Sequence, residues 1–337
     1  MRRPSLNSVI LETDKLVRQA IPSILVRIEN RSLRALARRA LRQKREFDRA
    51  LFVRIGCEAC GGNWRLLKPA LVAAEMIDAS LIVVDDIFDD SCSRAGAPPL
   101  FQEFGPERTV AAAFALTYLA AELLAELMSK DRQLKDSRAE IGSEFFGSLR
   151  HTWEGQYQDI VFQENSHGPL SFSGYLELIK QTTGHQIGAY LRLGARLCSG
   201  SADVAAALYE FGIILGALLQ IRDDYLDYFG SEEMIGKGPF SDYAAGKKRL
   251  PIILATRYSS PTELRLLNKG FGRGHRADAD RALVLRAISN ERAVASLRKL
   301  VGRYVQNARK IIADIPRQSH AKASLEELLF LAGGGAD

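Results

Sequence analysis

The chain has 337 residues, of which 47% are hydrophobic and 26% are charged, a composition typical of an ordinary folded protein. The formal net charge of +6 suits an anionic substrate. Because no zinc-finger spacing or aromatic RNA-binding signature occurs, we expect no nucleic-acid partner. The N-terminus lacks an apolar core followed by a cleavage site, and charges interrupt the longest apolar runs, so we predict a cytoplasmic protein without a transmembrane segment.

The N-terminal region is rich in arginine, especially between residues 27 and 49. Leu33, Leu36 and Leu41 keep an apolar face at helical spacing within it. We therefore predict a basic helical segment over about residues 1–40, with the arginines on a solvated face. A surface that meets acidic lipid or a diphosphate is the alternative.

Cys57 and Cys60 form a CxxC pair, and Cys92 and Cys198 are the other two cysteines. No second CxxC or HxxxH occurs to complete a zinc site, so the sequence favours reduced thiols over a metal or redox role.

The rest of the chain predicts an all-α fold. Residues 111–128 are rich in strong helix formers, and residues 204–221 are apolar on nearly every side, as in a helix at the centre of a bundle. Breakers separate the helical stretches, and no linker divides the chain. We expect a single domain over residues 1–337, ending in a flexible tail at about 332–337.

Two aspartate clusters share the form DDxxD. In the first, Asp85 and Asp89 lie four residues apart and share a helical face, with Asp86 between them. Like charges at this spacing repel one another, and a bound cation removes the repulsion.

The second cluster repeats the spacing with Asp223 and Asp227, joined by Asp224, directly after the apolar helix. Mg²⁺ prefers carboxylate oxygens together with substrate phosphates. Two such clusters therefore indicate a diphosphate held by Mg²⁺.

These segments resemble the trans-isoprenyl diphosphate synthase family, also called polyprenyl synthetases. The resemblance runs from about residue 49 to 251. It includes both aspartate motifs and the segments CEACGG, EGQYQD and SDYAAGKKRLP.

The resemblance implies the isoprenoid synthase fold, a bundle of long antiparallel helices around a deep central pocket. It implies three Mg²⁺ ions and commonly a homodimer. The implied metal ligands are Asp85, Asp89 and Asp223, supported by Asp86, Asp224 and Asp227. The implied substrate-binding residues are Arg94, Lys237 and Lys247 at the allylic diphosphate, Gln220 beside it, and Arg49 at the second substrate.

The sequence departs from the family where isopentenyl diphosphate, the second substrate, would bind. Glu46 stands at an expected lysine, Asp78 at a histidine and Ala95 at an arginine. Thr182 replaces a lysine that serves the allylic diphosphate. These changes favour a terpene synthase, which ionises the allylic diphosphate and releases diphosphate without using isopentenyl diphosphate.

One alternative is a chain-elongating synthase, such as a geranylgeranyl diphosphate synthase. A second is a non-catalytic regulatory subunit of a prenyl synthase, which the two complete aspartate motifs disfavour.

Ser80 and Leu81 lie about one turn before Asp85, where the family sets the depth of the pocket. Because Ser80 is small, we expect a C15–C25 allylic diphosphate, with C20 favoured. Thr183 and Gln156 are further predicted pocket residues.

Overall fold

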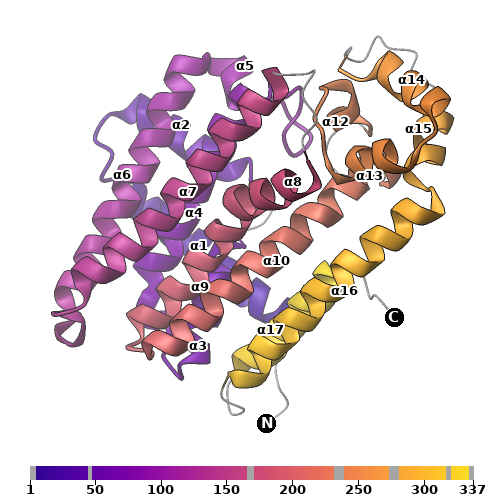
Figure 1. Cartoon of the computed structure of the whole chain (residues 1–337). Helices are drawn as coiled ribbons and strands as arrows, with labels where there is room; N and C mark the ends of the chain where they lie inside the picture. Colours follow the sequence, from indigo (N-terminus) through magenta and orange to yellow (C-terminus); the bar gives the residue numbers. More distant parts are fainter. Residues whose placement is uncertain are drawn as a thin grey trace. The chain divides into compact units, whose positions relative to one another are not determined.

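The computed structural model describes residues 5–44, 48–164, 171–230, 239–272, 281–315 and 320–333. Helices make up the regular structure of these residues, and no strand occurs among them apart from an isolated bridge between Arg94 and Ala97 (Figure 1). The all-α prediction is therefore confirmed.

The chain divides into two compact units. Unit 1 comprises Met1–Ser148, Ile187–Gly212 and Ile311–Glu327, and unit 2 comprises Leu149–Gln186, Ile213–Lys310 and Leu328–Asp337. The single-domain organisation stays a prediction.

Unit 1 is built on α4 and α6, which pack along one another (Figure 1). The middle of α4 is buried on every side from Ala70 to Ser80, where most residues are small or apolar and the charged Glu75 and Asp78 are buried with them. The helices that lie wholly in this unit are α1 (Leu6–Leu25), α2 (Arg31–Arg42), α3 (Arg49–Ala59), η1 (Trp64–Leu67), α4 (Lys68–Phe88), α5 (Leu100–Phe104), α6 (Pro106–Lys130) and η2 (Arg132–Leu134).

The described part of the basic N-terminal segment forms α1 and α2. Leu36 and Leu41 are buried, whereas Arg38 and Arg42 are exposed, so the arginines of α2 line a solvated face. The side chain of Asn30 accepts a hydrogen bond from the amide of Leu33 and caps the start of α2.

Helix α3 approaches α9 (His185–Leu197) at backbone distance. A Cβ atom on Gly56 would lie 2.0 Å from the carbonyl oxygen of Leu191, and one on Gly194 would lie 1.9 Å from that of Val53. Only glycine fits at either position, and the two glycines let the helices touch.

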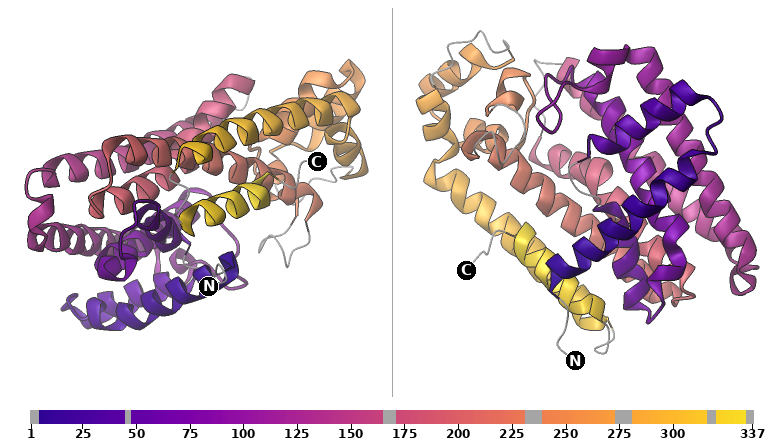
Figure 2. Two further views of the ribbon diagram at one scale, coloured as in Figure 1. Left: turned by 90° about the horizontal axis from the view of Figure 1, so that it is seen from below. Right: turned by 180° about the vertical axis from the view of Figure 1, so that it is seen from behind.

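Unit 2 contains the end of α7 and the last part of α10. Its core holds Tyr175, Leu178, Ile221 and Leu250, which are buried and pack together. Helices α13, α14 and α15 lie next to one another (orange in Figure 2). The remaining helices are α7 (Arg138–Glu164), α8 (Phe172–Ile179), η3 (Lys180–Gly184), α10 (Ala202–Phe229), α12 (Ser241–Ala244), α13 (Leu250–Tyr258), α14 (Pro261–Gly270), α15 (Arg281–Ile288), α16 (Glu291–Asp314) and α17 (His320–Ala332). Helices α7, α9, α10, α16 and α17 contribute residues to both units.

The segment η3 is a π-helix. A π turn contains one residue more than an α turn, and such turns are frequent at functional sites. Here it carries Thr182 and Thr183, two residues singled out by the sequence.

Two of the described helices, α6 and α10, are long and apolar enough to cross a membrane by length and composition. Core helices of soluble proteins meet the same criteria, and half of the apolar window of α10 is buried inside the protein. The absence of a membrane span stays a prediction.

Candidate functional site

The first aspartate motif forms the last turn of α4. The helix ends at Phe88, and the amide of Asp89 still donates to the carbonyl of Asp85 at 2.9 Å, which keeps these two residues on one face. Both side chains are half-buried. Asp86 points into the protein and is 1% exposed. The motif therefore presents two carboxylates and buries the third.

Asp86 holds Arg94. Nε of Arg94 donates to Oδ1 of Asp86 at 3.0 Å, and its Nη2 makes a second contact with the same oxygen. Burial by itself lowers the pKa of Arg94, but the hydrogen bond and charge of Asp86 raise it above the ordinary value. The guanidinium thus stays charged beside the first motif.

A tight turn fixes the backbone of Arg94. Its amide donates to the carbonyl of Ala97 at 2.8 Å, and the amide of Ala97 donates back at 3.1 Å. The two residues between them, Ala95 and Gly96, have φ of 53° and 80°. Positive φ at both central positions gives a hairpin-type turn, which directs Arg94 back toward Asp86.

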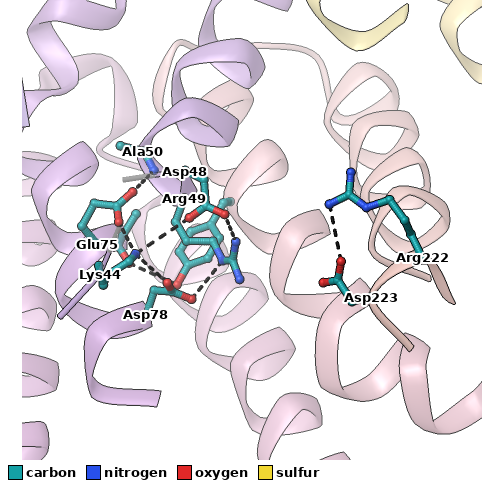
Figure 3. Close-up of polar contacts among 10 residues, drawn as sticks. Lys44, Asp48, Arg49, Ala50, Glu75, Asp78, Arg222 and Asp223 are labelled. Atoms are coloured by element: carbon teal, nitrogen blue, oxygen red, sulfur yellow. Dashed lines mark hydrogen bonds and ion pairs between the residues drawn. The ribbon is translucent and has the colours of Figure 1, made fainter. Parts of the chain in front are cut away.

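The second motif lies in the last two turns of α10. Asp223 is exposed and lies 3.4 Å from Arg222 (Figure 3). Asp224 is buried and accepts hydrogen bonds from Tyr175 at 2.5 Å and from Gln220 at 2.9 Å. Burial raises the pKa of Asp224 to about 6, although the nearby Arg249 opposes the shift.

Asp227 joins α10 to the SDYAAGKK segment. Its carboxylate accepts from the hydroxyl of Ser241 at 2.6 Å and from the amide of Asp242 at 3.1 Å. The carbonyl of Asp242 in turn accepts from the amide of Lys247 at 2.8 Å. Asp227 therefore positions the segment that carries the buried Lys247. Lys237 lies outside the described residues.

Three further residues of unit 2 were not identified as site residues from the sequence: Asp159, Tyr175 and Arg249. Arg249 donates to both oxygens of Asp159, at 2.9 and 2.8 Å, and both side chains are largely buried. Arg249 belongs to the SDYAAGKKRLP segment, and Asp159 ends EGQYQD, so the motifs contained a signal for this pair. Tyr175 had none, because it belongs to no motif.

The predicted second-substrate region contains an ionic cluster in unit 1, which we call the Lys44 cluster (Figure 3). It consists of Lys44, Asp48, Arg49, Glu75 and Asp78. Asp78 lies 2.5 Å from Nζ of Lys44 and 2.9 Å from Nε of Arg49. Lys44 also contacts Glu75, and Arg49 lies 2.5 Å from Asp48.

Three carboxylates thus accompany two cations within the Lys44 cluster. Burial by itself lowers the pKa of Lys44, but Asp78 and Glu75 outweigh it and raise the pKa. Burial raises the pKa of Glu75 to about 7. The sequence placed Glu46 at the family's lysine, and that residue lies outside the described part of the chain. Lys44, two residues earlier, supplies a cation beside Asp78 instead.

The predicted pocket residues occupy varied environments. Ser80 is buried and donates to the carbonyl of Ile77 at 2.6 Å, and it accepts from Thr117 at 2.9 Å. Thr183 donates to Gln220 at 3.0 Å. The remaining two, Leu81 and Gln156, are half-buried.

Only part of the predicted site lies within one unit. The first motif and the Lys44 cluster belong to unit 1, whereas the second motif, Lys247 and Gln220 belong to unit 2. The convergence of the two motifs on one diphosphate, and the deep pocket, stay predictions.

A family model described as polyprenyl synthetase matches residues 33–288, about three quarters of the chain. A geranylgeranyl pyrophosphate synthase from Geoglobus acetivorans is 28% identical over 94% of this chain and 96% of its own length. A geranylgeranyl diphosphate synthase from Methanosarcina mazei is 27% identical over 79% of each chain. The relatives' names favour the chain-elongating alternative over the terpene synthase prediction.

Solved structures show the same fold. A polyprenyl synthase from Caulobacter crescentus, complexed with calcium and isoprenyl diphosphate, has a TM-score of 0.84 at 23% identity and covers 99% of this chain and 98% of its own. A geranylgeranyl pyrophosphate synthase from Corynebacterium glutamicum, complexed with isoprenyl diphosphate and magnesium, has a TM-score of 0.84 at 21% identity, covering 98% and 99%. The predicted isoprenoid synthase fold is confirmed.

Proposed function

Because the chain belongs to the polyprenyl synthetase family, we propose that it ionises an allylic isoprenyl diphosphate with Mg²⁺ and adds the allylic cation to isopentenyl diphosphate. The names of the relatives support elongation, and a C20 chain is the proposed length. A homodimer in the cytoplasm and a single catalytic domain are part of the same proposal.

The observation that carries this proposal is the division of the six aspartates by exposure. Asp85, Asp89 and Asp223, the proposed metal ligands, are half-buried or exposed. Their partners Asp86, Asp224 and Asp227 are buried and bonded within the protein. Accessible carboxylates of this kind suit Mg²⁺, which keeps substrate oxygens and waters in its shell.

In this mechanism the C–O bond to the diphosphate breaks, and the electron pair leaves with the diphosphate. Bound Mg²⁺ would neutralise the charge that develops there. Arg94, held by Asp86, and Lys247, positioned through Asp227, would supply cations to the same leaving group. Lys237 is proposed for the same role, and Gln220 is proposed to line the site.

A second candidate, the terpene synthase, is favoured by the Lys44 cluster. Asp78 already contacts both Lys44 and Arg49, so neither cation offers a diphosphate its full charge. Repulsion between a diphosphate and the carboxylates of Asp48 and Asp78 would cost on the order of several kcal/mol at an effective dielectric constant near 20. An enzyme with this cluster would bind isopentenyl diphosphate weakly and release a hydrocarbon or an alcohol.

One assay separates these functions. The purified protein is incubated with Mg²⁺ and C10, C15, C20 or C25 allylic diphosphate, with and without isopentenyl diphosphate, and all products are identified. Elongation predicts longer diphosphates that require isopentenyl diphosphate. The terpene synthase predicts diphosphate release and a hydrocarbon or alcohol without it. A regulatory subunit, which the complete motifs disfavour, would give no turnover in either arm.

A further inference from the structure

The structure brings a third cysteine to the CxxC pair, which the sequence left without a partner. A Cβ atom on Gly62 would lie 2.4 Å from Sγ of Cys198 and 2.8 Å from Sγ of Cys57. The two sulfurs therefore lie beside the same glycine, although 140 residues separate them in the chain. The two thiols are close enough that each shifts the pKa of the other.

The close approach of α3 and α9 produces this arrangement. The helices touch at Gly56 and Gly194, and Cys57 follows the first glycine directly. After α3, the amide of Gly62 donates to the carbonyl of Cys57 at 3.0 Å, which folds the chain back over the thiol. Cys198 follows the last residue of α9. The sulfurs are thus placed by rigid elements.

The environments of the two thiols differ. Cys57 is fully buried, whereas Cys198 is half-buried and can meet a small solute. Interaction with Cys57 lowers the pKa of Cys198, whereas interaction with Cys198, together with burial, raises the pKa of Cys57. Cys198 is therefore the thiol that ionises first, and a thiolate is the form that reacts with oxidants.

A metal site is the weaker interpretation of the three cysteines. Among the described residues, only Asp48, Glu75 and Asp78 bring three possible ligand atoms within 4.8 Å of one another. The sulfurs of Cys57, Cys60 and Cys198 do not meet that spacing. Burial also raises the pKa of Cys60 to about 11, which keeps this third thiol protonated.

We propose that Cys57 and Cys198 form a redox-sensitive pair that hydrogen peroxide oxidises to a disulfide linking the end of α3 to the end of α9. The Cys198 thiolate attacks the peroxide, gains one oxygen and becomes a sulfenic acid, and hydroxide leaves. The sulfur of Cys57 then attacks the Cys198 sulfur and displaces a second hydroxide. The two thiol protons and the two hydroxides give two waters, and peroxide is the electron acceptor. The inference does not depend on the proposed function.

The test uses the full-length protein, reduced and then treated with a modest excess of hydrogen peroxide. Free thiols are alkylated, and disulfide-linked peptides are mapped by mass spectrometry. We expect the protein to lose two hydrogen atoms in mass and to yield one linked peptide pair, Cys57 with Cys198. Because the bond closes a long loop, the oxidised protein should unfold several degrees higher, and a reductant should reverse the shift.

Variants of single cysteines test which thiols form the disulfide. Cys60→Ser and Cys92→Ser should still form the disulfide, since Cys92 is exposed on a separate segment. Cys198→Ser should abolish it. A link between Cys60 and Cys198, or a sulfinic acid at Cys198 without any link, would overturn the proposal. Mapping in the unsubstituted protein gives the answer even where a variant folds poorly.

Discussion

Nε of Arg49 lies 2.9 Å from Oδ1 of Asp78, and the other oxygen of that carboxylate lies 2.5 Å from Lys44. One aspartate therefore pairs with two cations. In the proposed function, Asp78 is the residue that most weakens the binding of isopentenyl diphosphate at this cluster.

Asp78→His should lower the KM for isopentenyl diphosphate by roughly tenfold, because removing one like charge at about 5 Å is worth ~1–3 kcal/mol at an effective dielectric constant near 20. Steady-state kinetics with a saturating allylic diphosphate measure the change. Asp78→Asn, which removes the charge without adding a cation, should show part of the effect. An unchanged KM in both variants would mean that the Lys44 cluster does not meet the second substrate.

Asp85→Asn, Asp89→Asn and Asp223→Asn should each reduce kcat/KM by roughly 10²-fold or more, since each removes a proposed Mg²⁺ ligand. Their thermal midpoints should stay close to that of the unsubstituted protein, because these side chains are not buried. Asp90→Asn is the matched control. It directly follows the first motif, is exposed, and has φ of 45°, which asparagine tolerates. Equal losses in Asp90→Asn would contradict the assignment.

The helices and the two aspartate motifs could be predicted from the residue pattern within short segments. The ion pairs and hydrogen bonds between distant segments could not. The spacing of Asp85 and Asp89 placed both on one helical face, and the apolar run before Asp223 predicted the helix that carries it. Tyr175, which donates to the buried Asp224, comes from a distant segment that only the folded chain brings near it.

The same limit explains Lys44. Alignment on the CEACGG segment places the family's lysine at Glu46, and a small shift in register toward Lys44 or Arg45 restores a cation. The ammonium of Lys44 reaches Asp78 from two residues earlier. Likewise, Cys198 belongs to no CxxC motif, so the sequence does not pair it with Cys57. The two residues lie side by side because two glycines let α3 and α9 touch.

Arg249→Lys should destabilise the protein by ~2–4 kcal/mol, because lysine lacks the planar fork that makes two parallel hydrogen bonds to the oxygens of the buried Asp159. The free energy of unfolding in urea measures the loss. Arg257→Lys, on the last turn of α13 and exposed, is the control and should change stability little. If Arg249→Lys has the same free energy of unfolding as Arg257→Lys, the pair of Arg249 and Asp159 does not stabilise the fold.

Ser80→Phe should shift the preferred allylic diphosphate toward shorter chains. Ser80 is buried and bonded to Thr117 of α6, so a phenyl ring has no room there without entering the neighbouring space. Product lengths from competing C15 and C20 substrates give the readout. Ser80→Ala, which adds no volume, should leave the distribution unchanged. If both variants behave alike, Ser80 does not set the depth of the pocket.

Glu75→Gln should change how stability depends on pH. The pKa of Glu75 in the folded protein is about 7, above its ordinary value of 4.5, so the folded state binds more protons between these pH values. This group's contribution to stability is therefore lost as the pH rises from about 4.5 to about 7. Relative to the unsubstituted protein, the variant should gain stability over that window by on the order of 1–3 kcal/mol. Urea unfolding of both proteins at pH 5 and pH 8 measures this gain. If the difference between their free energies of unfolding is the same at both pH values, the raised pKa of Glu75 is contradicted.

The π-helix at Lys180–Gly184 has a consequence for how this chain tolerates length changes. Its extra residue turns every later side chain by about 100° from where an unbroken α-helix would point it. Deleting one residue there would convert the π turn into regular α-helix, so the helical backbone would persist. It would also swing Thr183 away from Gln220. A deletion that helix propensity alone would tolerate would thus change which side chains of α9 face its neighbours.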